Sequence, residues 1–203
     1  MMGFASAHRS GKTTTAKIVA ERLGIPFFDG SFGALAQELG YNSVAAMTPE
    51  ARIVMQERCL ALHVAKIQAM PRPAITDRTP LDYLAYAMAE VPMHAGLSPE
   101  ISARIHAYME NCLEVTRQNY LAIAVLDPLP NYKSEDGKPP PCLAYQHHIQ
   151  IIIEGASRRV ADPVMIARLT GGFDLEKRVR HCAGFFATAM QRLDTERHNE
   201  VLH

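Results

Sequence analysis

A segment near the N-terminus has the residue types and the spacing needed to bind phosphate. Its residues, Ser6-Ala7-His8-Arg9-Ser10-Gly11-Lys12-Thr13, follow an apolar run at 2–5 and lead directly into a helical pattern at 12–23. In such a strand–loop–helix unit, backbone N–H groups and the helix N-terminus face an anion, the lysine reaches the outer phosphates and the threonine hydroxyl binds Mg²⁺. We therefore predict a phosphate-binding loop. Its binding residues are Ala7, His8, Arg9, Ser10, Gly11, Lys12, Thr13 and Thr14.

The start of this loop departs from the usual pattern G-x-x-x-x-G-K-[ST]. Ser6 occupies the position of the first glycine, and Gly3 is out of register with the pattern. Serine makes the beginning of the loop less permissive than glycine would. The alternative interpretation is an ordinary helix-capping turn, but the strand before the loop and the helix after it favour phosphate binding.

Aspartates follow three of the apolar runs. Asp77 is followed at once by Arg78 and then by the start of a helical pattern, which favours a functional role. Asp127 is followed by Pro128, which favours the capping of a turn. Asp29 stays open between the two interpretations, because aspartate commonly ends a strand by capping the next turn or helix.

Apolar runs alternate with helical patterns along the chain, and this alternation predicts the fold class. The expected strands are 2–5, 25–29, 73–77, 120–126 and 164–169. The expected helices are 12–23, 33–40, 49–70, 80–90, 98–118, 143–158 and 174–194. We predict an α/β fold with a parallel sheet, helices on both faces and ligands beyond the carboxyl ends of the strands. The 203 residues suffice for a single domain over 1–203 and are too few for two of typical size.

Composition narrows the function classes. Lys and Arg together number 21, as do Asp and Glu, and this zero net charge argues against a whole-surface attraction to nucleic acid or acidic membranes. The four cysteines are far apart and form no C-x-x-C pair, so we expect free thiols rather than metal ligands. No leader or membrane-spanning run is evident, and we expect a soluble protein of the cytosol.

Three motifs carry a more specific signal. They are the loop at 7–13, Phe28-Asp29-Gly30, and the run Asp77-Arg78-Thr79-Pro80-Leu81-Asp82-Tyr83-Leu84-Ala85-Tyr86. Together they resemble the group of P-loop kinases that contains thymidylate and deoxynucleoside kinases. The chain resembles still more closely the small AAA-like kinases of phage and bacteria, and some phage members of that group phosphorylate 5-hydroxymethyluracil in DNA. The resemblance implies a P-loop NTPase three-layer sandwich, with a five-stranded parallel sheet in the order 2-3-1-4-5, and ATP and Mg²⁺ as cofactors.

The resemblance also implies roles for individual residues. In thymidylate kinases an Asp-Arg pair follows the third strand, with the arginine on the acceptor and the aspartate beside the reacting phosphates and metal. Asp77 and Arg78 match that pair. In deoxynucleoside kinases a carboxylate after the second strand is the base for the acceptor hydroxyl, and Asp29 lies at that position. The predicted catalytic residues are Lys12, Asp29, Asp77 and Arg78, and the predicted metal ligands are Thr13 and Asp77.

Two further features stay open between a functional and a structural role. The proline-rich stretch 127–143 is either a lid over the phosphates, with Lys133 and Lys138 as its cations, or a surface loop. Tyr83 and Tyr86 either stack on an acceptor base or pack in the core.

We predict an ATP-dependent kinase that transfers the γ-phosphate to a nucleoside or nucleotide-type acceptor. The acceptor is either free or the hydroxymethyl group of 5-hydroxymethyluracil in DNA, and the neutral net charge weighs against DNA. The alternative is a P-loop ATPase or nucleotide switch that acts on a protein partner. We expect no membrane partner, and a homodimer is a further prediction.

Overall fold

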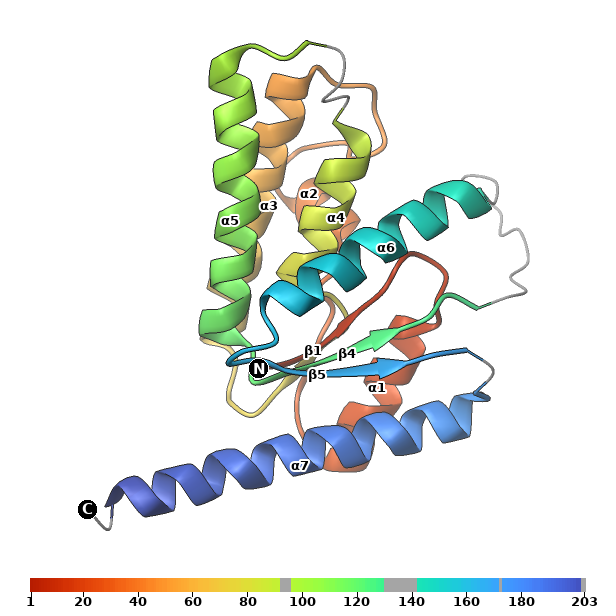
Figure 1. The fold of residues 1–203 in the computed structure, drawn as a ribbon, viewed down its shortest axis with the longest axis vertical. Coiled ribbons are helices and arrows are strands. Elements are labelled where there is room, and N and C mark those ends of the chain that lie inside the picture. The colour runs from red at the N-terminus through yellow and green to blue at the C-terminus, as the bar shows by residue number, and fades with distance from the viewer. Residues whose placement is uncertain (92–95, 130–141, 172, 202–203) are drawn as a thin grey trace.

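The computed structural model describes residues 1–91, 96–129, 142–171 and 173–201 (Figure 1). The strands within these ranges are β1 (Met2–Ala5), β2 (Phe27–Phe28), β3 (Ile75–Thr76), β4 (Ala122–Leu126) and β5 (Met165–Leu169). The helices are α1 (Lys12–Leu23), α2 (Phe32–Glu38), α3 (Pro49–Ala69), α4 (Pro80–Glu90), α5 (Pro99–Asn119), α6 (Leu143–Arg159) and α7 (Leu175–Val201).

The five strands form one parallel sheet in the order β2-β3-β1-β4-β5, which confirms the predicted fold class and strand order. In its centre, Met2 of β1 lies opposite Ile75 of β3 on one side and Ala122 of β4 on the other. The next two strands in the chain, β2 and β3, lie on one side of β1, and the last two, β4 and β5, lie on its other side. Ligands of open α/β sheets bind at such a switch point, and here the loop that follows β1 lies there.

Alternating strand residues separate two hydrophobic cores, one on each face of the sheet. On β4, Ile123 and Val125 belong to the core beneath α3–α6, whereas Ala122, Ala124 and Leu126 belong to the core beneath α1 and α7. Figure 1 shows this division into three layers, with α1 and α7 on one side of the strands and α6 on the other. Helices on both faces leave β1, β3 and β4 buried, as expected for the centre of a parallel sheet.

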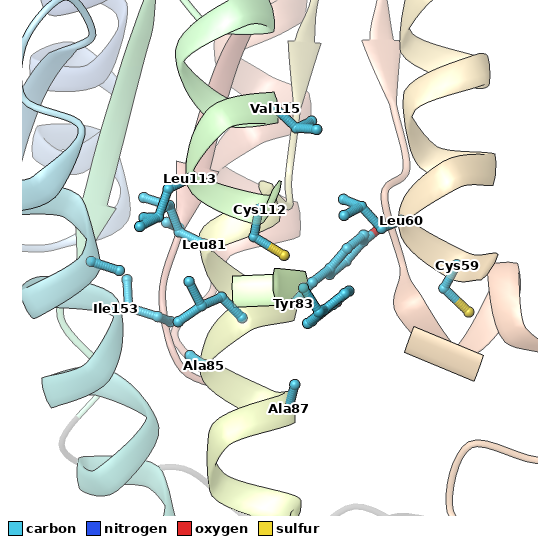
Figure 2. Packing of buried hydrophobic residues seen from close by; sticks show 14 of the residues in the cluster. Cys59, Leu60, Leu81, Tyr83, Ala85, Ala87, Cys112, Leu113, Val115 and Ile153 are labelled. Carbon is cyan, nitrogen blue, oxygen red and sulfur yellow. The ribbon is translucent and has the colours of Figure 1, made fainter. Parts of the chain in front are cut away.

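The larger core extends away from the sheet between α3, α4 and α5. In Figure 2, Tyr83 of α4 lies between Leu60 of α3 and Cys112 of α5. All three side chains are at most 2% exposed. This packing fixes α4, and therefore the residues that precede it, against the rest of the molecule.

The observed helix starts agree with the predicted ones, because the residues that mark a helix start lie next to it in the sequence. Thr48 and Ser98 each accept a hydrogen bond from a backbone N–H three residues on, at 3.3 Å, and a proline follows each of them. The strands β2 and β3 are shorter than predicted, and α7 continues beyond the predicted end at 194 to Val201. No helix in the described ranges is long and apolar enough to cross a membrane.

Gly3 has a structural role in the centre of the sheet rather than in the loop. A Cβ atom at this position would lie 2.5 Å from Thr79 Cγ2 and 2.7 Å from Tyr120 Cε1. Real Cβ atoms do not approach so closely, so β1 can pass these side chains only where it has none of its own.

Candidate active site

The loop after β1 has the backbone conformation of an anion cradle. Arg9 and Gly11 have φ angles of 60° and 73°, in the left-handed region, and α1 begins immediately afterwards at Lys12. No side chain caps the N-terminus of α1. Its first-turn N–H groups are therefore available to an anion, with the helix dipole favouring negative charge at that point.

Two glutamines of α6 explain why serine is accepted at position 6. The only non-glycine residue with a positive φ in the described ranges is Arg9, so Ser6 does not need the freedom of glycine. Ser6 Oγ donates to Gln150 Oε1 at 3.5 Å, and Ala7 N–H donates to the same oxygen at 3.1 Å. Gln146 Nε2 donates to the His8 carbonyl at 2.8 Å. Neither glutamine is predicted from the sequence, because the contacts that reveal their role join residues far apart in the chain.

Lys12 is held by Asp82, another residue that the sequence analysis did not select. Lys12 Nζ donates to Asp82 Oδ1 at 2.5 Å and to the Ser6 carbonyl at 2.7 Å. Burial lowers the pKa of Lys12, and the Asp82 charge acts in the opposite direction. Asp82 also accepts from Thr79 N–H at 2.9 Å, in a capping box that starts α4. That Thr79–Asp82 spacing was the signal for this residue in the sequence.

The two predicted metal ligands lie side by side. Thr13 Oγ1 donates to Asp77 Oδ2 at 2.5 Å, and Asp77 Oδ1 accepts from Gly30 N–H at 2.9 Å. Asp77 is 2% exposed. Hydroxyl and carboxylate oxygens fit Mg²⁺, which takes few protein ligands and completes its shell with water and phosphate oxygens. These two residues can hold the metal next to the loop.

Arg78 and Tyr86 line the same cavity as the phosphate loop. The Arg78 guanidinium lies 5.4 Å from the centre of the Tyr86 ring and 4.0 Å from Asp82 Oδ1. Tyr86 Oη and His8 Nδ1 share a hydrogen bond of 3.2 Å. Burial lowers the pKa of His8, and the neighbouring Arg9, Arg78 and Lys12 charges lower it further. His8 is therefore neutral beside this cationic group.

The sequence left the roles of Tyr83 and Tyr86 open, and the structure places the two side chains in different surroundings. Tyr83 is buried, donates to the Gly30 carbonyl at 2.9 Å and shares a hydrogen bond of 3.0 Å with His63. Tyr86 is half-buried and lines the cavity next to the loop. Tyr83 is therefore a core residue, and Tyr86 is the tyrosine that a ligand can contact.

The other two strand-end aspartates bind backbone N–H groups. Asp29 is exposed, accepts from Ser31 N–H at 3.0 Å and is not among the residues that line the cavity. Asp127 accepts from Gly171 N–H at 2.8 Å and so caps the turn after β5. Asp77 is thus the strand-end aspartate that the structure brings next to Lys12 and Thr13, whereas Asp29 closes a turn just before α2.

A cavity of about 740 Å³ lies beside the phosphate loop, Arg78 and Tyr86. All eight predicted loop residues, 7–14, line it, together with Phe32, Gln56, Arg78 and Tyr86. Within the described ranges, two buried side-chain atoms have no hydrogen-bond partner, Ser10 Oγ and Gln56 Nε2, and both residues line this cavity. Buried polar atoms normally find partners, so these two indicate a ligand site.

Helix α7 contributes a further cation beside the loop. Arg178 is 7% exposed and donates to the Ser10 carbonyl, and burial lowers the pKa of its guanidinium. Lys133 and Lys138 of the predicted lid lie outside the described residues. Arg178 is thus a positive charge directly behind the phosphate loop, on a helix 168 residues further along the chain.

The sheet order and the phosphate loop after β1 define the fold of P-loop kinases. No protein-family profile and no curated protein sequence matches the chain.

Among solved structures, a deoxyadenosine kinase from M. mycoides with dCMP and dCDP bound is similar at a TM-score of 0.63 and 11% identity, covering 92% of this chain and 98% of that one. A thymidylate kinase from Candida albicans is similar at a TM-score of 0.62 and 15% identity, covering 92% and 90%. The YorR protein of Bacillus subtilis, in complex with phosphorylated GDP, gives 0.53 and 12%, covering 94% and 96%.

Proposed function

We propose that this chain is an ATP-dependent kinase whose acceptor is a nucleoside or nucleotide. One observation carries the proposal: a single cavity brings the phosphate loop and Lys12 together with Arg78 and the Tyr86 ring. A donor phosphate and a flat, polar acceptor require such neighbouring surfaces, one cationic and one aromatic. The likeness to deoxyadenosine and thymidylate kinase folds supports the same choice.

On the donor side, the loop N–H groups and Lys12 bind the β- and γ-phosphates of ATP. Thr13 and Asp77 hold Mg²⁺, which supplies charge neutralisation on the phosphates when it is bound. Phosphoryl transfer depends on positioning and electrostatics more than on covalent participation of the protein. The hydrogen bonds from Gln146 and Gln150 to the loop therefore matter, because they fix the cradle before ATP arrives.

On the acceptor side, Arg78 holds a phosphate or another anionic group and Tyr86 contacts the base. Gln56 Nε2 is buried without a partner on the cavity wall, and its Oε1 accepts from Tyr108 Oη at 3.1 Å. An amide N–H in this position suits a hydrogen-bond acceptor on the base. Free nucleosides, nucleotides and 5-hydroxymethyluracil in DNA all present such atoms, and we propose this group of acceptors.

The role of Asp29 as base for the acceptor hydroxyl stays a prediction. Its carboxylate is exposed and engaged with Ser31 N–H, so this role requires the start of α2 to approach the acceptor. The lid over 127–143 and a homodimer are likewise predictions.

Transfer of label from [γ-³²P]ATP to a panel of nucleosides, nucleotides and hydroxymethyluracil-containing DNA tests the proposal. We expect one acceptor class to become labelled, with loss of labelling in Lys12→Met. Labelling of DNA should fall steeply as salt rises, because DNA binding releases counterions, whereas labelling of a nucleoside should change little. Release of inorganic phosphate without labelling of any acceptor would instead favour an ATPase or nucleotide switch.

A further inference from the structure

Asp82 occupies the junction between the phosphate loop and the start of α4. Its side chain is fully buried, and both carboxylate oxygens have partners. Oδ2 accepts from Thr79 N–H and from Thr79 Oγ1, at 2.9 and 3.1 Å. Oδ1 accepts from Lys12 Nζ at 2.5 Å and from Ser6 N–H at 3.4 Å. One half of the carboxylate thus belongs to α4, and the other half belongs to the loop.

The Oδ1 contact involves the group that an incoming phosphate must bind. Lys12 lines the cavity, whereas Asp82 does not, so the Lys12 ammonium lies between the cavity and a buried negative charge. A triphosphate that reaches Lys12 places a second set of negative charges around one ammonium group. The phosphate charges and the Asp82 carboxylate would then lie on either side of the same ammonium, and two negative charges this close repel each other strongly in a buried setting. The arrangement therefore favours a Lys12 that leaves Asp82 when it binds the phosphates over a Lys12 that contacts both.

A second cation is positioned to occupy the oxygen that Lys12 leaves. Arg78 Nη1 is 4.0 Å from the same Oδ1, just beyond hydrogen-bond distance, and its side chain is 22% exposed. The guanidinium lies over the Tyr86 ring at the cavity wall. A small movement brings it to the carboxylate, where a charged hydrogen bond would fix its orientation.

We propose that Asp82 is a positioning residue that holds Lys12 in the nucleotide-free protein, releases it to the donor phosphates and then binds Arg78. Filling the donor site thereby orders the arginine on the cavity wall. That Arg78 faces the acceptor rests on the proposed function, whereas the exchange at Lys12 requires only that the loop binds a nucleoside triphosphate.

Binding of a non-hydrolysable ATP analogue, measured by calorimetry without any acceptor, tests the exchange. In Asp82→Asn the ammonium no longer has to leave a charged partner, so we expect Kd to fall about tenfold, the effect of one hydrogen bond between charged groups. Thr79→Val is the matched control: it weakens the same cap but keeps the carboxylate, and Kd should not fall. In a Lys12→Met background, Asp82→Asn should change Kd by much less.

An unchanged or higher Kd in folded Asp82→Asn would overturn the exchange, because a purely structural role for Asp82 predicts weaker binding. An equal tightening in the Lys12→Met background would overturn it too, since the effect would then be general repulsion of phosphate. ATP binding without transfer to any acceptor would refute the proposed kinase activity and leave this test intact.

A crystal structure of the wild-type chain with the same analogue provides a test that does not depend on the folding of a variant. We expect Lys12 Nζ on the phosphates and beyond hydrogen-bond distance of Asp82 Oδ1, with Arg78 in contact with that oxygen. A retained Lys12–Asp82 bond would overturn the exchange. An Arg78 still at its present distance would overturn the ordering of the acceptor wall.

Discussion

Lys12 and Asp82 show how a functional residue and a structural one depend on each other. Lys12 is 6% exposed, and Asp82 is fully buried, with Lys12 as its hydrogen-bonded cation. Removal of one partner of a buried ion pair leaves an unpaired charge, which is more damaging than the loss of the pair as a whole. Substitution of the lysine therefore changes both binding and stability, and the two effects have to be measured separately.

The Lys12→Met variant should lose phosphoryl transfer by about 10²–10³-fold, the effect of removing one donor that stabilises a transition-state charge. Its free energy of unfolding should fall by up to about 3 kcal/mol, because Asp82 stays buried without its hydrogen-bonded cation and Arg78 replaces it only in part. Adding Asp82→Asn should restore most of the stability and none of the activity. Denaturant unfolding and the labelling assay on both variants check this. A double variant as unstable as Lys12→Met would show that the unpaired Asp82 charge is not the cause of the lost stability.

The aspartates at 77 and 29 should respond differently to metal. Asp77→Asn removes the charge of the proposed metal ligand beside Thr13, so activity should fall and Mn²⁺ should partly restore it, since Mn²⁺ binds such sites more tightly than Mg²⁺. Asp29→Asn keeps an oxygen that can accept from Ser31 N–H but cannot take a proton. It should lower kcat without rescue by Mn²⁺. Equal rescue of both variants by Mn²⁺ would show that Asp77 and Asp29 do not have separate roles.

At the scale of the elements, local signals predicted well and distant contacts did not. The starts of α3, α4 and α5 follow from Thr-Pro and Ser-Pro pairs, and β1 follows from an apolar run. Gln146 and Gln150 were missed because nothing local marks a glutamine that binds a loop 138 to 144 residues away. Arg178 was missed for the same reason. Asp29 has the position that the motif predicts, but its carboxylate turns to the backbone of Ser31.

The junction between β3 and α4 places Arg78 on the cavity wall, where we propose that it holds the acceptor, and this proposal makes a kinetic prediction. Arg78→Ala should lower kcat/KM for an anionic acceptor by about 10–100-fold, as loss of a charged hydrogen bond does, with a smaller loss of ATP affinity because Asp82 then lacks the cation that replaces Lys12. Arg159→Ala is a matched control, because that arginine pairs with Glu110 on the surface and should leave both quantities unchanged. A large loss of ATP affinity with unchanged acceptor kinetics would move Arg78 to the donor side.

At the scale of the whole molecule, one buried network links three helices with the sheet. His63 of α3 shares hydrogen bonds with Tyr83 of α4 at 3.0 Å and with Tyr120, just before β4, at 2.9 Å. Tyr120 Oη also lies 3.4 Å from the Arg78 carbonyl oxygen. His63 is fully buried. Burial lowers its pKa to about 4, with the Asp82 charge acting in the opposite direction, so the ring is neutral in the folded protein.

This neutral, buried histidine makes folding stability depend on pH in a defined direction. The unfolded chain binds a proton at His63 near the ordinary pKa of about 6.5, whereas the folded chain binds it only near pH 4. Between these values the unfolded state carries more protons, so stability should fall as pH falls, by up to about 3 kcal/mol in total. Urea unfolding of wild type and His63→Gln from pH 7 to pH 4 isolates this histidine from the carboxylates that titrate in both proteins. The wild-type curve should drop more steeply, and parallel curves would mean that His63 is not the group that titrates.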